Sequence, residues 1–422
     1  MTLSRRTFLG TLGAAALCDF DAYAQTAELP RANPAERLRI GHIGVRNQGR
    51  PNMRVHIRNT VALCDVDRDV LGQARDEVNK ANGGNVAAYS DYRRLLDDKN
   101  VDAVVVTTPD HWHALIAINA CQAGKHVYCE KPLTLTIAEG RALVRAARRH
   151  RVVVQTGSQQ RSDARFRQAC ELVRNGRLGR IETVRVGLPA VNFTGPAVPD
   201  SDPPANLDYD MWLGPAPQRP YNAKRVHYLF RFFWDYSAGQ LTNFGAHHLD
   251  IVQWGLGMDN SGPLAVEGTA RFHKQRWYEV PEWFELTYTY PNNIHVLCGQ
   301  NNGTRGGVEF QGTRGKLFVD RRRIEADPPE LLKQPLGDKD TRLPVSTNHH
   351  ANWLEAIRAG RLPICDAEIG HRSATVCHLG AIALRTGRRV RWDAAKEVIV
   401  GDEQQAAMVQ RTYRAPWRLP EI

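Results

Sequence analysis

The sequence lacks the features that define several protein classes. No apolar stretch approaches the roughly 20 residues needed to cross a bilayer, and there is no internal repeat and no low-complexity tract. Its eight cysteines include no C-x-x-C pair and no regular spacing. Because Cys64 and Cys129 lie in apolar, strand-like runs, where cysteine usually acts as a small buried hydrophobic residue, we expect no disulfide framework. We also expect no metal site, since the adjacent His247 and His248 would point about 100° apart on a helix.

Positive charge is in excess but is not concentrated. The formal net charge is +11, and its densest clusters, at 145–151 and 321–323, are short and contain no aromatic residues. A nucleic-acid-binding surface needs a concentrated basic face, so we expect no nucleic-acid partner. The 422 residues are enough for two or three domains with substantial cores.

Residues 1–24 have the pattern of an export signal. The segment SRRTFLG at 4–10 is followed by the short apolar run TLGAAAL and by Ala-Tyr-Ala at 22–24. A basic start, a short apolar region and an A-x-A site are typical of a cleaved signal peptide. The paired arginines predict the twin-arginine export machinery as a partner. We therefore expect a periplasmic or otherwise exported protein without a stable membrane anchor.

The sequence of residues 36–156 predicts one doubly wound α/β domain. Short runs rich in β-branched residues alternate here with helical patterns; the runs are 38–45, 60–66, 101–109, 126–130 and 152–157. Apolar strands that alternate with helices predict a parallel sheet covered on both faces.

The pattern changes after Gly157, so residues 157–422 are expected to form a second domain. A helical segment, one strand and a long loop rich in proline and asparagine (190–220) are followed from 262 by consecutive strands with turn signals. Such a run predicts an antiparallel sheet. Two further helices are predicted at 349–360 and 367–387.

A nucleotide site is indicated where the first strand ends. The segment GVRNQG, Gly44 to Gly49, matches the G-x-G-x-x-G spacing, except that Arg46 holds the second glycine position. Asp65 ends the second strand, 21 positions after Gly44. An acid at that distance bonds the ribose hydroxyls and repels a 2′-phosphate, which favours NAD over NADP. The alternative is an ordinary strand-to-helix turn that binds nothing.

Four segments, in this order, resemble the glucose-fructose oxidoreductase / inositol dehydrogenase family (Gfo/Idh/MocA). They are GVRNQG, LCDVD, TTPDHWHALIAINACQAGKHVYCEKPL and GQLTNFGAHHLDIVQWGLG. WLGPAPQRPY and EIGHRSATVCHLGAIALRTGRRVRW resemble its exported bacterial branch. The resemblance implies an NAD(P)-dependent oxidoreductase with an N-terminal Rossmann domain and a C-terminal domain built on a large, mostly antiparallel sheet. It also implies a homo-oligomer, with the number of subunits left open.

The resemblance assigns a role to the lysine that follows the strand HVYCE. In the family the lysine of E-K-P lies beside the nicotinamide and bonds the hydroxyl that is oxidised, and that role falls on Lys131. A surface salt bridge is the alternative for this lysine. The resemblance places the cofactor on Gly44, Asn47, Gln48, Gly49, Asp65, Thr108, Pro109, His111, His113, Glu130 and Lys131.

The second catalytic segment departs from the family pattern. The family has D-x-x-x-H, with the histidine as acid/base, whereas this chain has Asn243 and His247. The resemblance gives His247 the acid/base role, and i, i+4 spacing on a helix would put both side chains on one face. An amide can orient the imidazole but cannot stabilise its protonated form by charge. We expect both residues to belong to the catalytic group.

An aromatic segment suggests a carbohydrate substrate. Nine of the 28 residues from Tyr209 to Tyr236 are aromatic, and such rings pack against the C–H faces of sugars. Packing between domains or subunits is the alternative. Arg161, Arg231 and Asp235, together with His247, are the candidate substrate residues.

Three functions remain open at this point. The first is an NAD-linked oxidoreductase that acts on a hydroxyl of a sugar, polyol or glycoside, with a tightly retained cofactor. The second is a glycoside-cleaving enzyme or lyase that oxidises a ring hydroxyl transiently. The third is a catalytically weakened sugar-binding protein. The first two share every motif, and product analysis with a panel of glycosides would distinguish them.

Overall fold

The first domain is built on a six-stranded sheet in the computed structural model, which describes residues 37–191, 195–300 and 305–422. The strand order is β3-β2-β1-β4-β5-β6 and every pairing is parallel. The strands are β1 (Ile40–Ile43), β2 (Thr60–Cys64), β3 (Ala87–Tyr89), β4 (Ala103–Val106), β5 (His126–Cys129) and β6 (Val154–Thr156). This order is that of a Rossmann domain, so the predicted doubly wound sheet is confirmed. The predicted export signal lies outside the described residues.

Helices separate these strands, and their ends follow from local sequence. They are α1 (Gly49–Val55), α2 (Arg68–Asn82), α3 (Tyr92–Asp97), α4 (Asp110–Gln122) and α5 (Ile137–Arg149). The Asp67 side chain caps α2 by accepting hydrogen bonds from two of its first N–H groups, and Gly83 ends the helix in the left-handed region. Thr136 and Glu139 form a reciprocal capping box at the start of α5.

The second domain contains a nine-stranded sheet of order β13-β12-β11-β7-β10-β9-β8-β14-β15. Only the β7–β10 pairing is parallel among its described pairings, so the predicted antiparallel sheet is confirmed in the main. The strands are β7 (Ile181–Leu188), β8 (Ala265–Phe272), β9 (Pro281–Tyr290), β10 (Ile294–Gln300), β11 (Gly307–Gly312), β12 (Gly315–Val319), β13 (Ile324–Asp327), β14 (Val390–Asp393) and β15 (Val398–Ile399).

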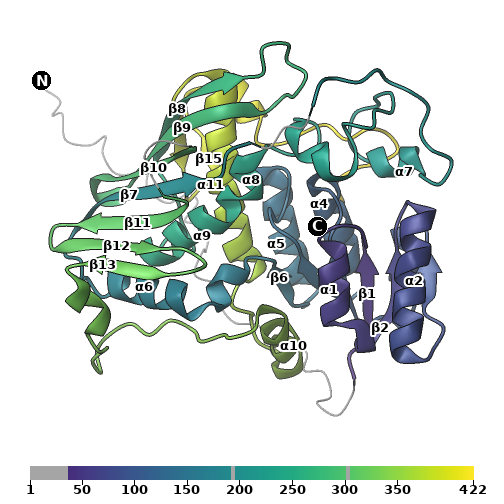
Figure 1. Ribbon diagram of the computed structural model, residues 1–422, viewed down its shortest axis with the longest axis horizontal. Coiled ribbons are helices and arrows are strands. Elements are labelled where there is room, and N and C mark those ends of the chain that lie inside the picture. The colour runs from purple at the N-terminus through teal and green to yellow at the C-terminus, as the bar shows by residue number, and fades with distance from the viewer. Residues whose placement is uncertain (1–36, 192–194, 301–304) are drawn as a thin grey trace, which may run out of the picture.

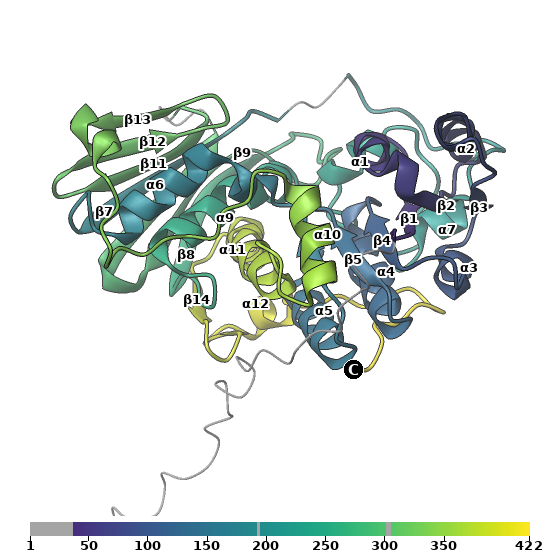
Figure 2. The ribbon, with the colours of Figure 1, turned by 90° about the horizontal axis from the view of Figure 1, so that it is seen from below.

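Three helices of the second domain cover one face of this sheet, whereas the helix at His349–Ala359 packs against the parallel sheet of the first domain (Figures 1 and 2). The described helices of this domain are α6 (Ala164–Arg174), α7 (Tyr209–Leu213), α8 (Gln240–Asn243), α9 (Gly245–Leu256), α10 (His349–Ala359), α11 (Ala367–Thr386) and α12 (Glu403–Ala407). α6, α9 and α11 share one hydrophobic core with the sheet. None of the described helices combines the length and apolar character that a membrane crossing requires.

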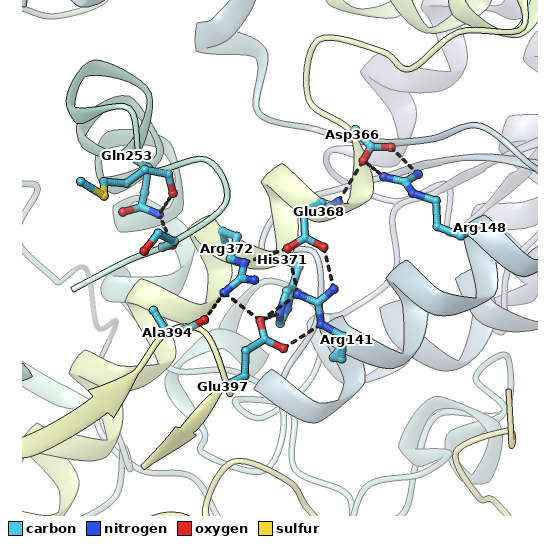
Figure 3. A network of polar contacts seen from close by, with 11 residues as sticks. Arg141, Arg148, Gln253, Asp366, Glu368, His371, Arg372, Ala394 and Glu397 are labelled. Carbon is cyan, nitrogen blue, oxygen red and sulfur yellow. Dashed lines mark hydrogen bonds and ion pairs between the residues drawn. The ribbon is translucent and has the colours of Figure 1, made fainter. Parts of the chain in front are cut away.

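An ionic cluster joins α11 of the second domain to α5 of the first (Figure 3). Arg141 on α5 donates to Glu368 on α11 at 2.6 Å and to Glu397 at 2.7 Å. Arg372 donates to Glu368 at 2.7 Å and forms an ion pair with Glu397 at 3.0 Å. Burial alone would raise the pKa of Glu368, but the hydrogen bonds and charge of Arg141 lower it to about 2. Arg148 and Asp366 form a second pair between the domains. These contacts fix the two domains relative to each other, and therefore fix the cleft between them.

Candidate active site

A cavity of about 690 Å³ lies between the domains, at the carboxyl ends of the parallel strands. The strand order reverses direction between β1 and β4, and doubly wound proteins bind ligands at that point. The first domain contributes the residues that follow β1, β2, β4 and β5, and the second contributes α8, α9 and the loop after β12.

The glycine turn after β1 has the geometry that a dinucleotide requires. Gly44 has a φ of 82°, and a Cβ there would lie 2.7 Å from the carbonyl oxygen of Thr107. A Cβ at Gly49 would lie 2.1 Å from the carbonyl oxygen of Gly44, so only glycine lets α1 begin directly against the turn. Gly44, Asn47 and Gln48 line the cavity, while Gly49 packs behind them.

Arg46, which lies within this turn, and Asp65, which follows β2, both have fixed partners in the protein. Arg46 forms an ion pair with Asp67, so its guanidinium is already neutralised beside the cavity. Asp65 accepts hydrogen bonds from the N–H groups of Val45 at 2.9 Å and Asp67 at 3.0 Å. Burial raises the pKa of Asp65, and these two bonds oppose that rise. Asp65 lines the cavity where an adenosine ribose would lie.

The segment after β4 contains three of the residues predicted to bind the cofactor, Thr108, Pro109 and His113. Thr108 and Pro109 line the cavity, and the Thr108 hydroxyl is buried without a hydrogen-bond partner in the described structure. His113 also lines it; its ring nitrogens lie 2.9 Å from the Thr108 carbonyl oxygen and 2.8 Å from that of Pro132. His113 thereby ties the end of β4 to the end of β5.

The lysine after β5 lies inside the cavity. Its Nζ donates to the backbone oxygen of Asn243 at 2.7 Å and to the side-chain Oδ1 of Asn243 at 3.0 Å. Burial lowers the pKa of Lys131, and the charges of Glu130 and Asp110 oppose that shift. Glu130 accepts from the Asn52 side chain at 3.0 Å and from the Lys131 backbone N–H at 3.3 Å. The Lys131–Pro132 peptide bond is cis. Lys131 therefore lies at the site and does not form a surface salt bridge.

His247 reaches the same part of the cavity from α9. Its Nδ1 is buried and has no hydrogen-bond partner among the described residues. Burial, and then the positive charges of Lys131 and Arg321, hold the pKa of His247 well below its usual range. A neutral imidazole keeps one nitrogen able to accept a proton.

The expectation that Asn243 and His247 share one helix is wrong. α8 ends at Asn243 and α9 begins at Gly245, because the chain leaves regular helical geometry at Phe244. The Asn243 side chain instead binds Lys131 through its oxygen and Gln240 through its nitrogen. Asn243 therefore positions the lysine and not the histidine.

Three predicted residues do not face this cavity. Arg161 is fully buried and forms ion pairs with Asp250 at 2.8 Å and Asp259 at 2.7 Å, so its charge is neutralised inside the second domain. Asp235 accepts from Arg219 at 2.9 Å and lines a separate cavity of about 300 Å³. His111 lines that second cavity as well, and its Nε2 lies 3.0 Å from the Trp212 carbonyl oxygen.

The aromatic segment contributes both to a hydrophobic core and to the cavity wall. Tyr209, Phe232, Phe233 and Tyr236 belong to a core whose buried members all come from the second domain. Trp212, Tyr228 and Phe230 line the cavity, as does the predicted Arg231.

Sequence reasoning missed several residues of the site. Arg321 lines the cavity from the loop after β12, although only its place in a basic cluster distinguishes it in sequence. Asp110, in the segment TTPDHWH, accepts a hydrogen bond from Ser237 at 2.5 Å. Asn52 holds Glu130, and an asparagine in the first turns of α1 gave no signal of that contact. The described residues contain no group of three side chains that could hold a metal ion.

Fold and site together define a two-domain, dinucleotide-binding protein with a lysine and a histidine at the end of the cofactor cleft. Residues 38–158 match the oxidoreductase family described by its NAD-binding Rossmann fold, and residues 191–419 match that family's C-terminal alpha/beta domain. The chain therefore belongs to the Gfo/Idh/MocA family of NAD(P)-dependent oxidoreductases.

Several known proteins are similar to this chain over part of its length. The myo-inositol 2-dehydrogenase of Thermotoga maritima is 32% identical over 157 residues, which cover 35% of this chain and 44% of that protein. A glycosyl hydrolase family 109 protein of Shewanella baltica is 33% identical over 171 residues, covering 35% and 37%. The chain thus spans less than half the length of these two curated relatives.

Solved structures share the fold over a larger part of the chain. The WlbA dehydrogenase from Bordetella pertussis, in complex with NADH and UDP-GlcNAcA, has a TM-score of 0.63 at 20% identity and covers 85% of this chain and 99% of its own. The aldose-aldose oxidoreductase from Caulobacter crescentus, complexed with glycerol, has a TM-score of 0.63 at 20% identity and covers 84% and 100%.

The residues present fit a nicotinamide dinucleotide. The turn from Gly44 to Gly49 keeps its tight shape because both glycines lack a Cβ, which would meet the backbone of Thr107 or Gly44. A turn of this kind before a helix N-terminus is where a diphosphate binds. Thr108, whose buried hydroxyl has no partner among the described residues, lines the cavity, and Asp65 is placed for a ribose. Lys131 and His247 then lie at the opposite end, where a nicotinamide and a substrate would meet.

Proposed function

We propose that this protein oxidises a hydroxyl of a sugar, polyol or glycoside with NAD as the cofactor. The observation that carries the proposal is the meeting of Lys131 and His247 at the end of a dinucleotide cleft, each with its pKa lowered by burial. The names of similar proteins, among them inositol and levoglucosan dehydrogenases, support a polyhydroxylated substrate. Asp65 favours NAD over NADP, because a second negative charge at the ribose would be repelled.

Bound NAD supplies a hydride acceptor for the carbon that bears the hydroxyl. Lys131 is placed to bind that hydroxyl and to take its proton, because burial lowers its pKa and so favours the neutral amine, which can accept a proton. Asn243 accepts hydrogen bonds from both N–H groups of the neutral amine through two oxygen atoms and so sets the direction of the nitrogen lone pair that takes the proton. Neutral His247 offers a second proton acceptor at the same site.

Glycoside cleavage through transient oxidation of a ring hydroxyl is the second candidate. It is favoured by the similarity to glycosyl hydrolase family 109 proteins of Shewanella. Oxidation at one carbon acidifies the neighbouring C–H, and a base such as His247 would remove that proton before the leaving group departs. The reaction would end without net change in the nicotinamide.

The export signal that the sequence predicts at residues 1–24 leads to a proposal about how the cofactor is kept. Twin-arginine transport carries folded proteins, and the dinucleotide is available to the chain only before export. An exported enzyme would therefore retain NAD through many turnovers and catalyse a reaction that is redox-neutral overall. Two substrates could share one nicotinamide, or one glycoside could be oxidised and re-reduced around a bond cleavage.

Two experiments test these proposals. The mature protein is purified without added dinucleotide and denatured, and the supernatant is assayed for NAD. Near-stoichiometric NAD is expected; near-empty protein that binds added NAD weakly would refute retention. Incubation with free sugars and with glycosides then distinguishes the candidates: an oxidised sugar indicates dehydrogenation, and an aglycone released without net redox change indicates cleavage. Absence of both products would refute the enzymatic proposal.

A further inference from the structure

Positive charge collects at the reacting end of the cavity. Lys131, Arg231 and Arg321 all line it, and the charges of both arginines act on Lys131. The charge of Arg321 also acts on His247. These two arginines therefore lie near the groups proposed to act on the substrate hydroxyl.

Arg231 is held in place by aromatic rings and a backbone oxygen. Its guanidinium lies over the rings of Tyr228, at 3.9 Å, and Phe230, at 5.1 Å, and it donates to the backbone oxygen of Tyr228. Its Nε is buried with no hydrogen-bond partner in the described structure. A desolvated donor without a partner costs free energy, and an arginine fixed this way is ready for an incoming acceptor.

Arg321 has a similar arrangement on another loop of the same domain, just after β12. It donates from Nε to the side chain of Gln160 at 3.1 Å and lies over the ring of Phe244 at 5.1 Å. Across the described part of the chain, no carboxylate forms an ion pair with either Arg231 or Arg321. By contrast, Arg161 and Arg219 each pair with two carboxylates.

Two carboxylates also line this end of the cavity. The charge of Asp110 acts on Lys131 and Arg231, and the charge of Glu130 acts on Lys131. Asp110 also accepts a hydrogen bond from Ser237, and Glu130 accepts one from Asn52. Asp65 and Asp67 lie beside the glycine turn, where they bind backbone N–H groups and Arg46. Neither carboxylate forms an ion pair with Arg231 or Arg321, so among the described residues these two guanidinium groups at the reacting end have no carboxylate partner of their own.

We propose that the substrate is a sugar with an anionic substituent, which Arg231 and Arg321 bind while Lys131 and His247 act on a hydroxyl. This inference rests on the proposed function, since it adds a substituent to the same substrate. A carboxylate suits planar guanidinium groups through paired hydrogen bonds, and a phosphate presents the same kind of acceptor oxygens. A neutral sugar would leave both arginines without an anionic partner.

The test measures binding and needs no turnover. The NAD-loaded protein is titrated calorimetrically with D-glucuronate, D-glucose 6-phosphate and D-glucose. At least one anion is expected to bind about tenfold or more tightly than D-glucose, because each charged hydrogen bond contributes substantially. The better anion identifies the substituent as carboxylate or phosphate. Equal or weaker binding of both anions would overturn the proposal.

Substitution of each arginine tests whether Arg231 and Arg321 are the residues that bind the anion. Arg231→Gln and Arg321→Gln are each expected to weaken binding of the preferred anion about tenfold and to leave binding of D-glucose unchanged. Arg322→Gln is the matched control. Arg322 is exposed and does not line the cavity, and its described contact is a hydrogen bond from its backbone N–H to the side chain of Asp320. Anion preference that survives both cavity substitutions would also overturn the proposal. NAD content, measured for every variant, shows that the fold is intact.

Anion binding and hydroxyl oxidation can fail separately. If an anion binds through the arginines but no sugar reduces the bound nicotinamide, the proposed oxidation is wrong and the binding site stands. If neutral sugars are oxidised and neither anion is preferred, the oxidation stands and the anionic substrate is wrong.

Discussion

Replacing Asn243 with aspartate should change the protonation of Lys131. In the native protein an uncharged Oδ1 accepts from Lys131 Nζ at 3.0 Å. Asn243→Asp puts a negative charge at that position, and an opposite charge within this range changes a pKa by about 1 to 3. The pKa of Lys131 should therefore rise by about that amount, which corresponds to about 1.4 to 4 kcal/mol favouring the ammonium form.

The direction of the effect on rate follows from the proposed role of the lysine. Lys131 must be neutral to accept the hydroxyl proton, so a higher pKa moves the acidic limb of the pH profile of kcat/KM to higher pH. Below that pKa, the rate at a fixed pH falls about tenfold each time the pKa of Lys131 rises by one. Restoring the carboxylate of the family pattern is therefore expected to lower kcat/KM at pH values below the pKa of Lys131, and not to raise it.

The assay is a pH profile of kcat/KM for wild type and Asn243→Asp with the best substrate of the sugar panel. Gln240→Glu serves as a graded control, because the described contacts of the Gln240 side chain include Asn243 but not Lys131. It should shift the limb in the same direction by less. An unmoved limb, or a limb at lower pH in Asn243→Asp, would refute the coupling of Asn243 to Lys131.

Three further predictions follow from the geometry. Lys131→Met should lower kcat by about 10² to 10⁴ without releasing NAD, because it removes only the group that handles the proton; comparable turnover would exclude the lysine. Gly49→Ala should yield NAD-depleted protein, since its Cβ would meet the first glycine's carbonyl oxygen at 2.1 Å, whereas Gly72→Ala, with nothing within 4 Å, should keep its NAD. His56 and His350 lie 3.1 Å apart, and burial lowers their pKa values to about 3 and about 4. Because the unfolded chain binds these protons more readily, the free energy of unfolding should be at its full value above pH 6.5 and should decrease below it, by about 1 to 2 kcal/mol per ring at pH 5. Thermal unfolding of His350→Gln should show a smaller decrease between pH 6.5 and pH 5, and a decrease equal to that of the wild type would contradict the prediction.

The first domain could be predicted from sequence because its signals are local. Apolar runs that alternate with helices determine a parallel sheet, and the ends of those strands must then meet at one edge. Gly44, Asp65 and Lys131 each lie at or just past the end of such a strand, so their convergence on one cleft is a consequence of topology.

Contacts between distant segments could not be predicted in the same way. Arg321 and Lys131 are 190 residues apart in sequence, and only the packing of the two domains brings both to one cavity. Arg161 follows the last parallel strand and could have faced the cleft, but Asp250 and Asp259 bind it inside the second domain. The assignment of Asn243 to His247 failed because a helix was assumed to continue through Phe244.

Rapid mixing of the NAD-containing protein with its substrate tests the central claim most directly. Fluorescence of the reduced nicotinamide is followed after addition of each sugar or glycoside that the protein converts. If a substrate hydroxyl is oxidised, the wild type should show fluorescence of reduced nicotinamide, and this signal should be lost in Lys131→Met. The signal should persist if the reaction is a dehydrogenation and should be transient if it is a glycoside cleavage. A substrate that is converted at full rate without any such signal would contradict the account.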